Sequence, residues 1–329
     1  MRRVPLVVLL AFSCGRHGFD PVPDAELAHV QVAPGWTVRR LIDLTGLVPY
    51  RPDDYQDGSN QTLDNAPTAV ASLYDPFTGT LAVAAGRSII EVGSDGSATV
   101  HDYRPAVPDT TGPDNLRALV FGAPPDIGPA LWIGAASQTK GDGVFDISPA
   151  WEIARDALYN NVRGIAYDAA GDFDSIGTPT IYFIDDSHVN RRISAGSDVQ
   201  LAGVSTTIST MAVSATALFL SDATVPAALD REFTATHARQ IITTSTAFTV
   251  LEGGPLDTTT ATAIRDKAVL AQYANDGTSQ DLASSTDPTW VWVAGSAPQP
   301  PHPLAGGFIV LESNRTLDRD QLLYLAPGS

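Results

Sequence analysis

The chain has 329 residues, of which 43% are hydrophobic and 17% charged, and its formal net charge is −17. This length is enough to bury a large core, as one large β domain or as two smaller ones. Only two lysines occur, Lys140 and Lys267, and the arginines are scattered along the chain. Because no basic patch is present to neutralise phosphates, we expect no nucleic-acid partner. The acidity favours solubility or, alternatively, a site for a cation or a cationic ligand.

The N-terminus has the layout of a secretory signal peptide. Arg2 and Arg3 precede an apolar run at residues 4–12, which is too short to span a bilayer. Cys14 follows this run and, as the only cysteine, cannot form an internal disulfide. Its position resembles the lipobox of bacterial lipoproteins, and this resemblance implies that Cys14 becomes the lipidated first residue. Ordinary cleavage, or a buried spare cysteine, is the alternative.

These signals predict three parts of the chain. Residues 1–13 are a signal peptide, residues 14–34 a lipid-anchored tether, and residues 35–329 the folded domain. The expected address is the bacterial cell envelope, on the non-cytoplasmic side of a membrane, or secretion if Cys14 is not lipidated. No later stretch reaches the ~18 apolar residues that a transmembrane helix needs. We expect the membrane, through the lipid anchor, to be one partner, and the domain to be a monomer.

The rest of the chain has the pattern of short strands joined by turns. Residues 36–44 form an isolated amphipathic strand. Four-strand patterns follow at about 68–103, 116–153, 161–193 and 207–251, and a fifth begins at 259. The last three strands lie at 290–294, 307–312 and 321–326. Helical patterning is nearly absent, with one short helix expected at 226–233.

The second strands of these patterns align with one another as TLAVAA, ALWIGA, TIYFID, ALFLSD and AVLAQY. A pattern of about four strands that recurs along the chain is typical of a β-propeller. Each blade of a propeller must stack on the next to bury its faces. We therefore predict an all-β fold with a single β-propeller of six four-stranded blades, five being possible. A β-sandwich of two domains is the runner-up.

The best-preserved copy of the pattern lies at residues 163–193. Its segments RGIAYD, IYFID and NRRI resemble the NHL repeat, whose pattern is GIAVD, IYVAD and N-x-RI. Propellers of that family commonly have six blades and close by pairing an N-terminal strand with C-terminal ones. The resemblance therefore implies that residues 36–44 complete the last blade. An inserted turn at 170–179 departs from the family pattern.

In such a propeller, the turns between second and third strands share one face with the connections between blades, and that face usually carries the site. The candidate ligand-binding residues on this face are Asn161, Asp185, Asp186, His188, Asp222 and Asp276. Oxygen ligands of this kind suit Ca²⁺ or another divalent cation, with Asn161 and Asp185 as the metal candidates. Asp and Asn are also ordinary turn residues, so a purely structural role stays open.

The sequence carries no recognisable catalytic signature. It has no histidine pair at zinc spacing, no Gly-x-Ser-x-Gly elbow and no phosphate-binding loop. No residue is therefore assigned a catalytic role, and we predict an envelope-anchored binding module for a protein, peptide or glycan. Enzymatic activity stays open. The alternative is a divalent-metal-dependent hydrolase or lyase similar to the lactonase-type six-bladed propellers. Asn161 loosely resembles the Asn that binds the metal in those propellers.

Overall fold

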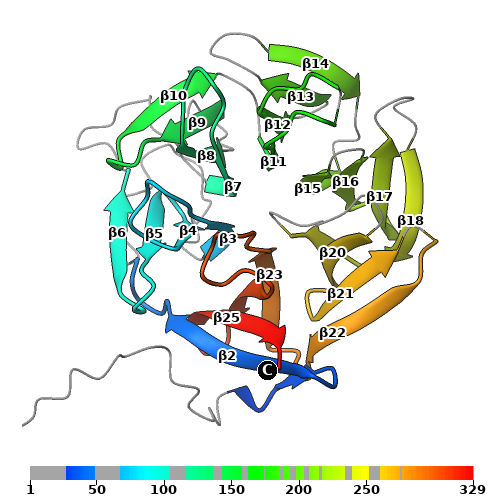
Figure 1. Ribbon diagram of the computed structural model, residues 1–329. Helices are drawn as coiled ribbons and strands as arrows, with labels where there is room; N and C mark the ends of the chain where they lie inside the picture. The colour runs from blue at the N-terminus through cyan, green and yellow to red at the C-terminus, as the bar shows by residue number, and fades with distance from the viewer. Residues whose placement is uncertain are drawn as a thin grey trace, which may run out of the picture.

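The protein forms a ring of six antiparallel sheets, as the computed structural model shows (Figure 1). The structure describes residues 27–48, 67–103, 116–135, 143–157, 162–173, 175–185, 188–192, 198–203, 207–214, 217–233, 239–251, 260–274 and 276–328. Each sheet is one blade, and its strands follow one another outward from the central axis. The predicted six-bladed β-propeller is confirmed, and the five-bladed alternative is excluded.

The first three blades each contain four strands that are consecutive in the chain. From the axis outward, blade 1 consists of β3 (Pro67–Ser72), β4 (Leu81–Ala85), β5 (Ser88–Val92) and β6 (Ala98–Asp102). Blade 2 consists of β7 (Leu116–Gly122), β8 (Ala130–Ala135), β9 (Gly143–Ile147) and β10 (Ile153–Ala157). Blade 3 consists of β11 (Gly164–Asp168), β12 (Thr180–Ile184), β13 (His188–Arg192) and β14 (Asp198–Gly203).

The other three blades complete the ring, and two of them include N-terminal strands. Blade 4 consists of β15 (Ile208–Ser214), β16 (Ala217–Asp222), β17 (Ala227–Phe233) and β18 (Arg239–Ser245). Blade 5 consists of β19 (Phe248–Val250), β20 (Thr260–Arg265), β21 (Val269–Ala274), β22 (Ser279–Ser285) and, outermost, β1 (Val30–Val32). Blade 6 consists of β23 (Trp290–Ser296), β24 (Phe308–Asn314), β25 (Arg319–Pro327) and β2 (Trp36–Asp43).

The N-terminal strands close the ring. The strand β2 pairs antiparallel with β25, with Val38 opposite Leu325, so the predicted closure of the last blade is confirmed. Trp36 stacks on Phe308 of the same blade, with ring centroids 5.7 Å apart. The short strand β1 falls within the interval 14–34 that the sequence assigns to a tether, and here it pairs with β22. Together the two strands cover edges that would otherwise invite aggregation.

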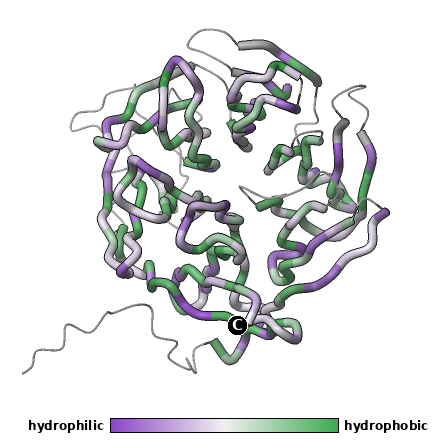
Figure 2. The backbone as a smooth tube through the Cα atoms, viewed as in Figure 1, coloured by the Kyte–Doolittle hydropathy of each residue, from purple (hydrophilic) through white to green (hydrophobic). Residues whose placement is uncertain are grey.

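The core lies between neighbouring blades. Buried side chains of the described residues form six clusters, and each cluster combines strands of two adjacent blades. The second strands β4, β8, β12 and β16 are buried on both faces, which explains why their sequences are apolar runs rather than alternating patterns. In Figure 2 the inner strands β7 and β15 are largely hydrophobic. No helix in the described part of the chain is long and apolar enough to cross a membrane.

Two local predictions were wrong. The segment expected as a helix at 226–233 is strand β17, which pairs with both β16 and β18. Its Ala-rich and Leu-containing sequence favours a helix locally, but two sheet neighbours override that preference. The segment AFTVLE, predicted to end the fourth blade, contains β19, the innermost strand of blade 5. As a result AVLAQY contributes the third strand of its blade, not the second.

Candidate functional site

A cavity of about 280 Å³ lies at the axis of the propeller, and we call it the axial pocket. Residues from blades 1, 2, 3, 4 and 6 line it, among them Tyr74, Phe121, Tyr167, Val213 and Gln299. Each of these follows or stands near the end of a first strand of its blade. The axial pocket is therefore at the face that carries the turns after β3, β7, β11 and β15, which we call the hairpin face. The opposite face carries the turns after β4, β8, β12 and β16, and we call it the connection face.

Three lining residues occupy the same place in successive blades. Phe121, Tyr167 and Val213 each pair with the second residue of the aligned strands ALWIGA, TIYFID and ALFLSD. The sequence prediction missed them because it looked for a site on the connection face. Their shared register position is the signal that could have found them, since equivalent positions of a propeller repeat lie at equal height around the axis.

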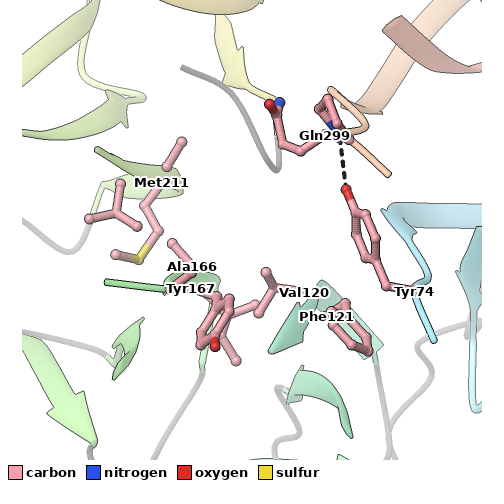
Figure 3. Close-up of a pocket in the computed structure, with 12 residues that line it drawn as sticks. Tyr74, Val120, Phe121, Ala166, Tyr167, Met211 and Gln299 are labelled. Atoms are coloured by element: carbon pink, nitrogen blue, oxygen red, sulfur yellow. Dashed lines mark hydrogen bonds between the residues drawn. The ribbon is translucent and has the colours of Figure 1, made fainter. Parts of the chain in front are cut away.

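Tyr74 connects the pocket wall to the last blade (Figure 3). Its ring lies 5.2 Å from that of Phe121, tilted by 48°. The backbone N–H of Gln299 donates to the Tyr74 hydroxyl at 2.7 Å, and the Gln299 side-chain amide donates to the Ala297 carbonyl at 2.8 Å. These polar groups of the pocket wall are therefore hydrogen-bonded within the protein itself.

His302 supports Tyr74 from behind, and its ring meets the Tyr74 ring edge-on at 5.4 Å. The Nε2–H of His302 donates to the Thr80 carbonyl at 2.8 Å, and Nδ1 accepts from the Leu304 backbone N–H at 3.0 Å. Burial lowers the pKa of His302 despite the hydrogen bond to Thr80. A neutral imidazole with both nitrogens occupied has a structural role.

Tyr167 forms the wall contributed by blade 3. Burial raises the pKa of its hydroxyl, and the charge of Asp168 raises it further, against a backbone hydrogen bond at Ala123 that lowers it. The hydroxyl is therefore protonated at neutral pH. Its ring lies against Gly122, where an added Cβ would come within 2.9 Å of the Tyr167 ring and 2.8 Å of Ile181. Glycine is required here by the close approach of two blades.

Asp168 holds the inserted turn that follows β11. One carboxylate oxygen accepts from the backbone N–H groups of Ala170 at 3.1 Å and Gly171 at 3.0 Å, and the other accepts from Phe173 at 2.8 Å. Phe173 is buried edge-on against Tyr182. The insertion is therefore a packed structural element next to the pocket wall.

The sequence-predicted site residues that the structure describes do not line the axial pocket. Asp185, at the end of β12, accepts from the His188 backbone N–H at 2.8 Å and from the Asn190 side-chain amide at 3.0 Å. The imidazole Nδ1 of His188 is 3.8 Å from Asp185, beyond hydrogen-bond distance. Asp222, at the end of β16, accepts from the Thr207 hydroxyl at 2.5 Å and from the Thr224 backbone N–H at 3.0 Å. Both carboxylates thus hold turns of the connection face.

Asp276 lies elsewhere, in the turn between the third and fourth strands of blade 5, and therefore on the hairpin face. It accepts from the backbone N–H and the hydroxyl of Thr278 at 2.9 and 2.6 Å, and these bonds lower the pKa of its carboxyl. It cannot join Asp185 and Asp222 at one mouth. Cys14, Asn161 and Asp186 lie outside the described residues.

The described side chains do not fit a divalent-cation site. No group of three or more His, Cys, Asp or Glu side chains in the described ranges could hold a metal ion. Both carboxylate oxygens of Asp185 already accept hydrogen bonds within their own turn.

Comparison with known proteins supports the fold. No family model matches the chain, and no curated protein matches it. Among solved structures, the soluble aldose sugar dehydrogenase of Escherichia coli is similar over 89% of this chain and 99% of its own, with 10% identity and a TM-score of 0.50. An auxiliary nutrient binding protein from Bacteroides thetaiotaomicron is similar over 81% of this chain and 79% of its own, with 9% identity and a TM-score of 0.50.

A third similar structure is an extracellular domain from the same Bacteroides species, with 16% identity and a TM-score of 0.45. It matches 82% of this chain, and this chain spans 34% of it. The fold comparison rests on the first two structures, and at their identities of 10% and 9% the likeness shows the fold alone and does not transfer an activity.

Proposed function

We propose that this protein is a binding module that holds a small organic ligand in the axial pocket. The observation that supports the proposal is the pocket itself, with Tyr74, Phe121 and Tyr167 on three successive blades and Met211 on the next. Its volume of about 280 Å³ is close to the lower end of the range of small-molecule sites, roughly 300–1,000 Å³. A space of this size suits one compact group, rather than the protein, peptide or glycan that the sequence suggested.

The lining favours a ligand with few hydrogen-bonding groups. The Tyr74 hydroxyl accepts from the backbone N–H of Gln299, and the Gln299 side-chain amide donates to the Ala297 carbonyl. A ligand with many hydroxyl groups would leave several of them without partners, which costs about 1–3 kcal/mol for each buried group. An apolar ligand, or a ligand whose charge is spread over a large group, avoids that cost.

Binding is better supported than chemistry. Among the described residues, those that line the axial pocket include no carboxylate, imidazole, amine or thiol side chain. The two tyrosine hydroxyls are the only titratable groups among them, and the raised pKa of Tyr167 makes it a poor base near neutral pH. The hydrolase or lyase alternative has no comparable supporting observation.

The proposal is tested by filling the pocket. Val213 lines the pocket and is partly buried, whereas Val225 is 99% exposed in a turn of the same blade. A collection of small neutral and cationic organic compounds is screened by the melting temperature of the full chain. A ligand at 100 times its Kd stabilises by ~2.7 kcal/mol, which is a rise on the order of 5 °C.

We expect the rise in melting temperature to disappear in Val213→Trp and to persist in Val225→Trp, which makes the same change away from the pocket. The proposal is wrong if no compound stabilises the wild-type protein. It is also wrong if the rise survives in Val213→Trp.

We also propose that the domain is anchored by lipid on Cys14 to a bacterial membrane, on its non-cytoplasmic side. The support is the N-terminal pattern of residues 1–14. The residues that follow Cys14 and precede β1 are the proposed tether. The NHL-like segment 163–193 contains the first three strands of blade 3, β11, β12 and β13, and we propose that the chain is a distant relative of NHL-type propellers.

A further inference from the structure

The axial pocket combines aromatic walls with a strongly acidic protein. The lining residues that the structure describes include three aromatic rings and the thioether of Met211, and none of them has a charged side chain. The chain as a whole has 37 acidic residues against 20 lysines and arginines. We propose that the ligand of the axial pocket is a methylated ammonium cation, such as the trimethylammonium group of choline. This inference rests on the proposed function, because it names the ligand class of the same pocket.

The aromatic rings supply the attraction. A cation held within ~6 Å of an aromatic ring face is drawn to the negative face of the ring, and quaternary ammonium groups are recognised in this way. Tyr74, Phe121 and Tyr167 line the pocket from three successive blades (Figure 3). The polarisable sulfur of Met211 suits the methyl groups of such a cation.

The hydrogen-bonding state of the wall points the same way. A trimethylammonium group has no N–H and needs no acceptor. The Tyr74 hydroxyl accepts from the backbone of Gln299, and the Gln299 side-chain amide donates to Ala297. A sugar ring or an amide ligand would have to compete with these bonds, whereas a methylated cation would leave them intact.

The electrostatic surroundings favour positive charge. Asp168, directly after Tyr167 in the chain, is 7% exposed. The negative charge of its carboxylate helps to raise the pKa of the Tyr167 hydroxyl. His302, which lies against Tyr74, is kept neutral by burial and so adds no opposing charge at neutral pH. The net charge of −17 attracts cations over a longer range.

The test compares choline with 3,3-dimethylbutan-1-ol, which has the same shape but a carbon in place of the charged nitrogen. Both are titrated into the full-length protein by calorimetry. A cation–π contribution predicts that choline binds about 3- to 30-fold more tightly than its neutral isostere. The inference is overturned if the isostere binds as tightly as choline, or if choline does not bind.

Variants of Tyr167 identify the source of the preference. Tyr167→Phe keeps the ring, and we expect it to retain the preference for choline. Tyr167→Leu removes the ring, and we expect it to weaken choline binding about 10-fold while changing binding of the isostere much less. Equal weakening of both ligands would contradict a cation–π role for Tyr167.

The ligand comparison uses the wild-type protein, so it does not depend on whether a variant folds. If choline fails but another compound stabilises the protein in a way that Val213→Trp abolishes, the proposed function stands and this inference fails. If no compound binds, both fail.

Discussion

At the scale of single residues, Glu312 is a buried carboxylate that joins three parts of the chain, which are β23, β25 and the segment before β1. Its carboxylate is fully buried and accepts three hydrogen bonds, from His29 Nε2 at 2.9 Å, Trp292 Nε1 at 2.8 Å and Gln321 Nε2 at 2.7 Å. Because a carboxylate only accepts, Nε2 of His29 must carry a proton. The His29 ring also stacks on Trp290, with centroids 4.8 Å apart. This contact ties the segment before β1 to blade 6.

We expect His29→Phe to keep the stacking on Trp290 and to remove the hydrogen bond to Glu312. The loss of a donor to a buried carboxylate predicts destabilisation by about 1–3 kcal/mol, and His29→Ala should cost more because it also loses the stacking. The measurement is the free energy of unfolding in urea. His188→Phe, at a partly exposed histidine on the connection face, is the control and should change stability by less than about 0.5 kcal/mol.

An unchanged stability in His29→Phe would show that Trp292 and Gln321 satisfy Glu312 without help. The sequence could not pair these residues. His29 and Glu312 are 283 positions apart, and nothing in either local pattern marks a partner.

At the scale of elements, the hairpin between β20 and β21 shows how a turn fastens one blade to the next. Asp266 and Lys267 both have positive φ, at 54° and 57°, as the two central residues of a type I′ turn require, and the Ala268 N–H donates to the Arg265 carbonyl at 3.1 Å. The Asp266 carboxylate accepts from the hydroxyls of Ser245 at 2.7 Å and Thr246 at 2.6 Å, and from the Thr246 backbone N–H at 2.9 Å. These donors lie at and just after the end of β18, so the turn fixes blade 5 against blade 4.

The charge of Asp266 makes this contact dependent on pH. Burial acts to raise the pKa of Asp266, but the hydrogen bonds from Thr246 and Ser245 outweigh it, so the pKa lies below its ordinary value. A carboxyl with a lower pKa in the folded state stabilises the fold above its unfolded pKa of about 3.9. That contribution is lost as the pH falls through the folded-state pKa.

We therefore expect Asp266→Asn to destabilise the protein at pH 7 by about 0.5–1 kcal/mol, a modest value because the side chain is 38% exposed. The difference from the wild type should shrink at pH 3, as the carboxyl becomes protonated. Urea unfolding at both pH values measures it. Asp318→Asn makes the same change at another exposed residue with positive φ and should have little effect at either pH. A difference for Asp266→Asn that is the same at pH 7 and pH 3 would contradict the role of the charge.

The elements that the sequence predicted well are those whose patterns are local. The second strands are continuous apolar runs bounded by turns, and they were found in blades 1 to 4. The strands β17 and β19 were not, since β17 has a helix-favouring composition and β19 has only three residues. Both are strands because of their neighbours, which no single segment of sequence displays.

At the scale of the whole molecule, the N-terminal segment both closes the ring and leads toward the proposed anchor. We expect Cys14→Ser to move the protein from the membrane fraction to the soluble fraction, because it removes the lipid attachment point and leaves no apolar helix in the described fold to replace it. Fractionation of cells that express the full chain measures this. Protein that stays in the membrane fraction would refute lipidation of Cys14.

Local patterns were enough to predict an all-β propeller of six blades, and the resemblance to the NHL repeat implied its closure by residues 36–44. Strand period, turn residues and repetition are properties of short segments, and the structure contains most of the strands and turns that they predict. The position of the site needed the assembled ring. In an antiparallel blade, a count that is wrong by one strand exchanges the two faces, and this error placed Asp276 beside Asp185.

The axial pocket itself exists only in the tertiary structure. Tyr74, Phe121, Tyr167 and Gln299 are spread over 226 positions of the chain and meet only when the inner strands gather at the axis. Each of these residues lies at or shortly after the end of a strand, and its local sequence does not mark it as part of a pocket. Their convergence is set by the packing of blade against blade, a long-range interaction that the amino-acid pattern of one blade does not contain.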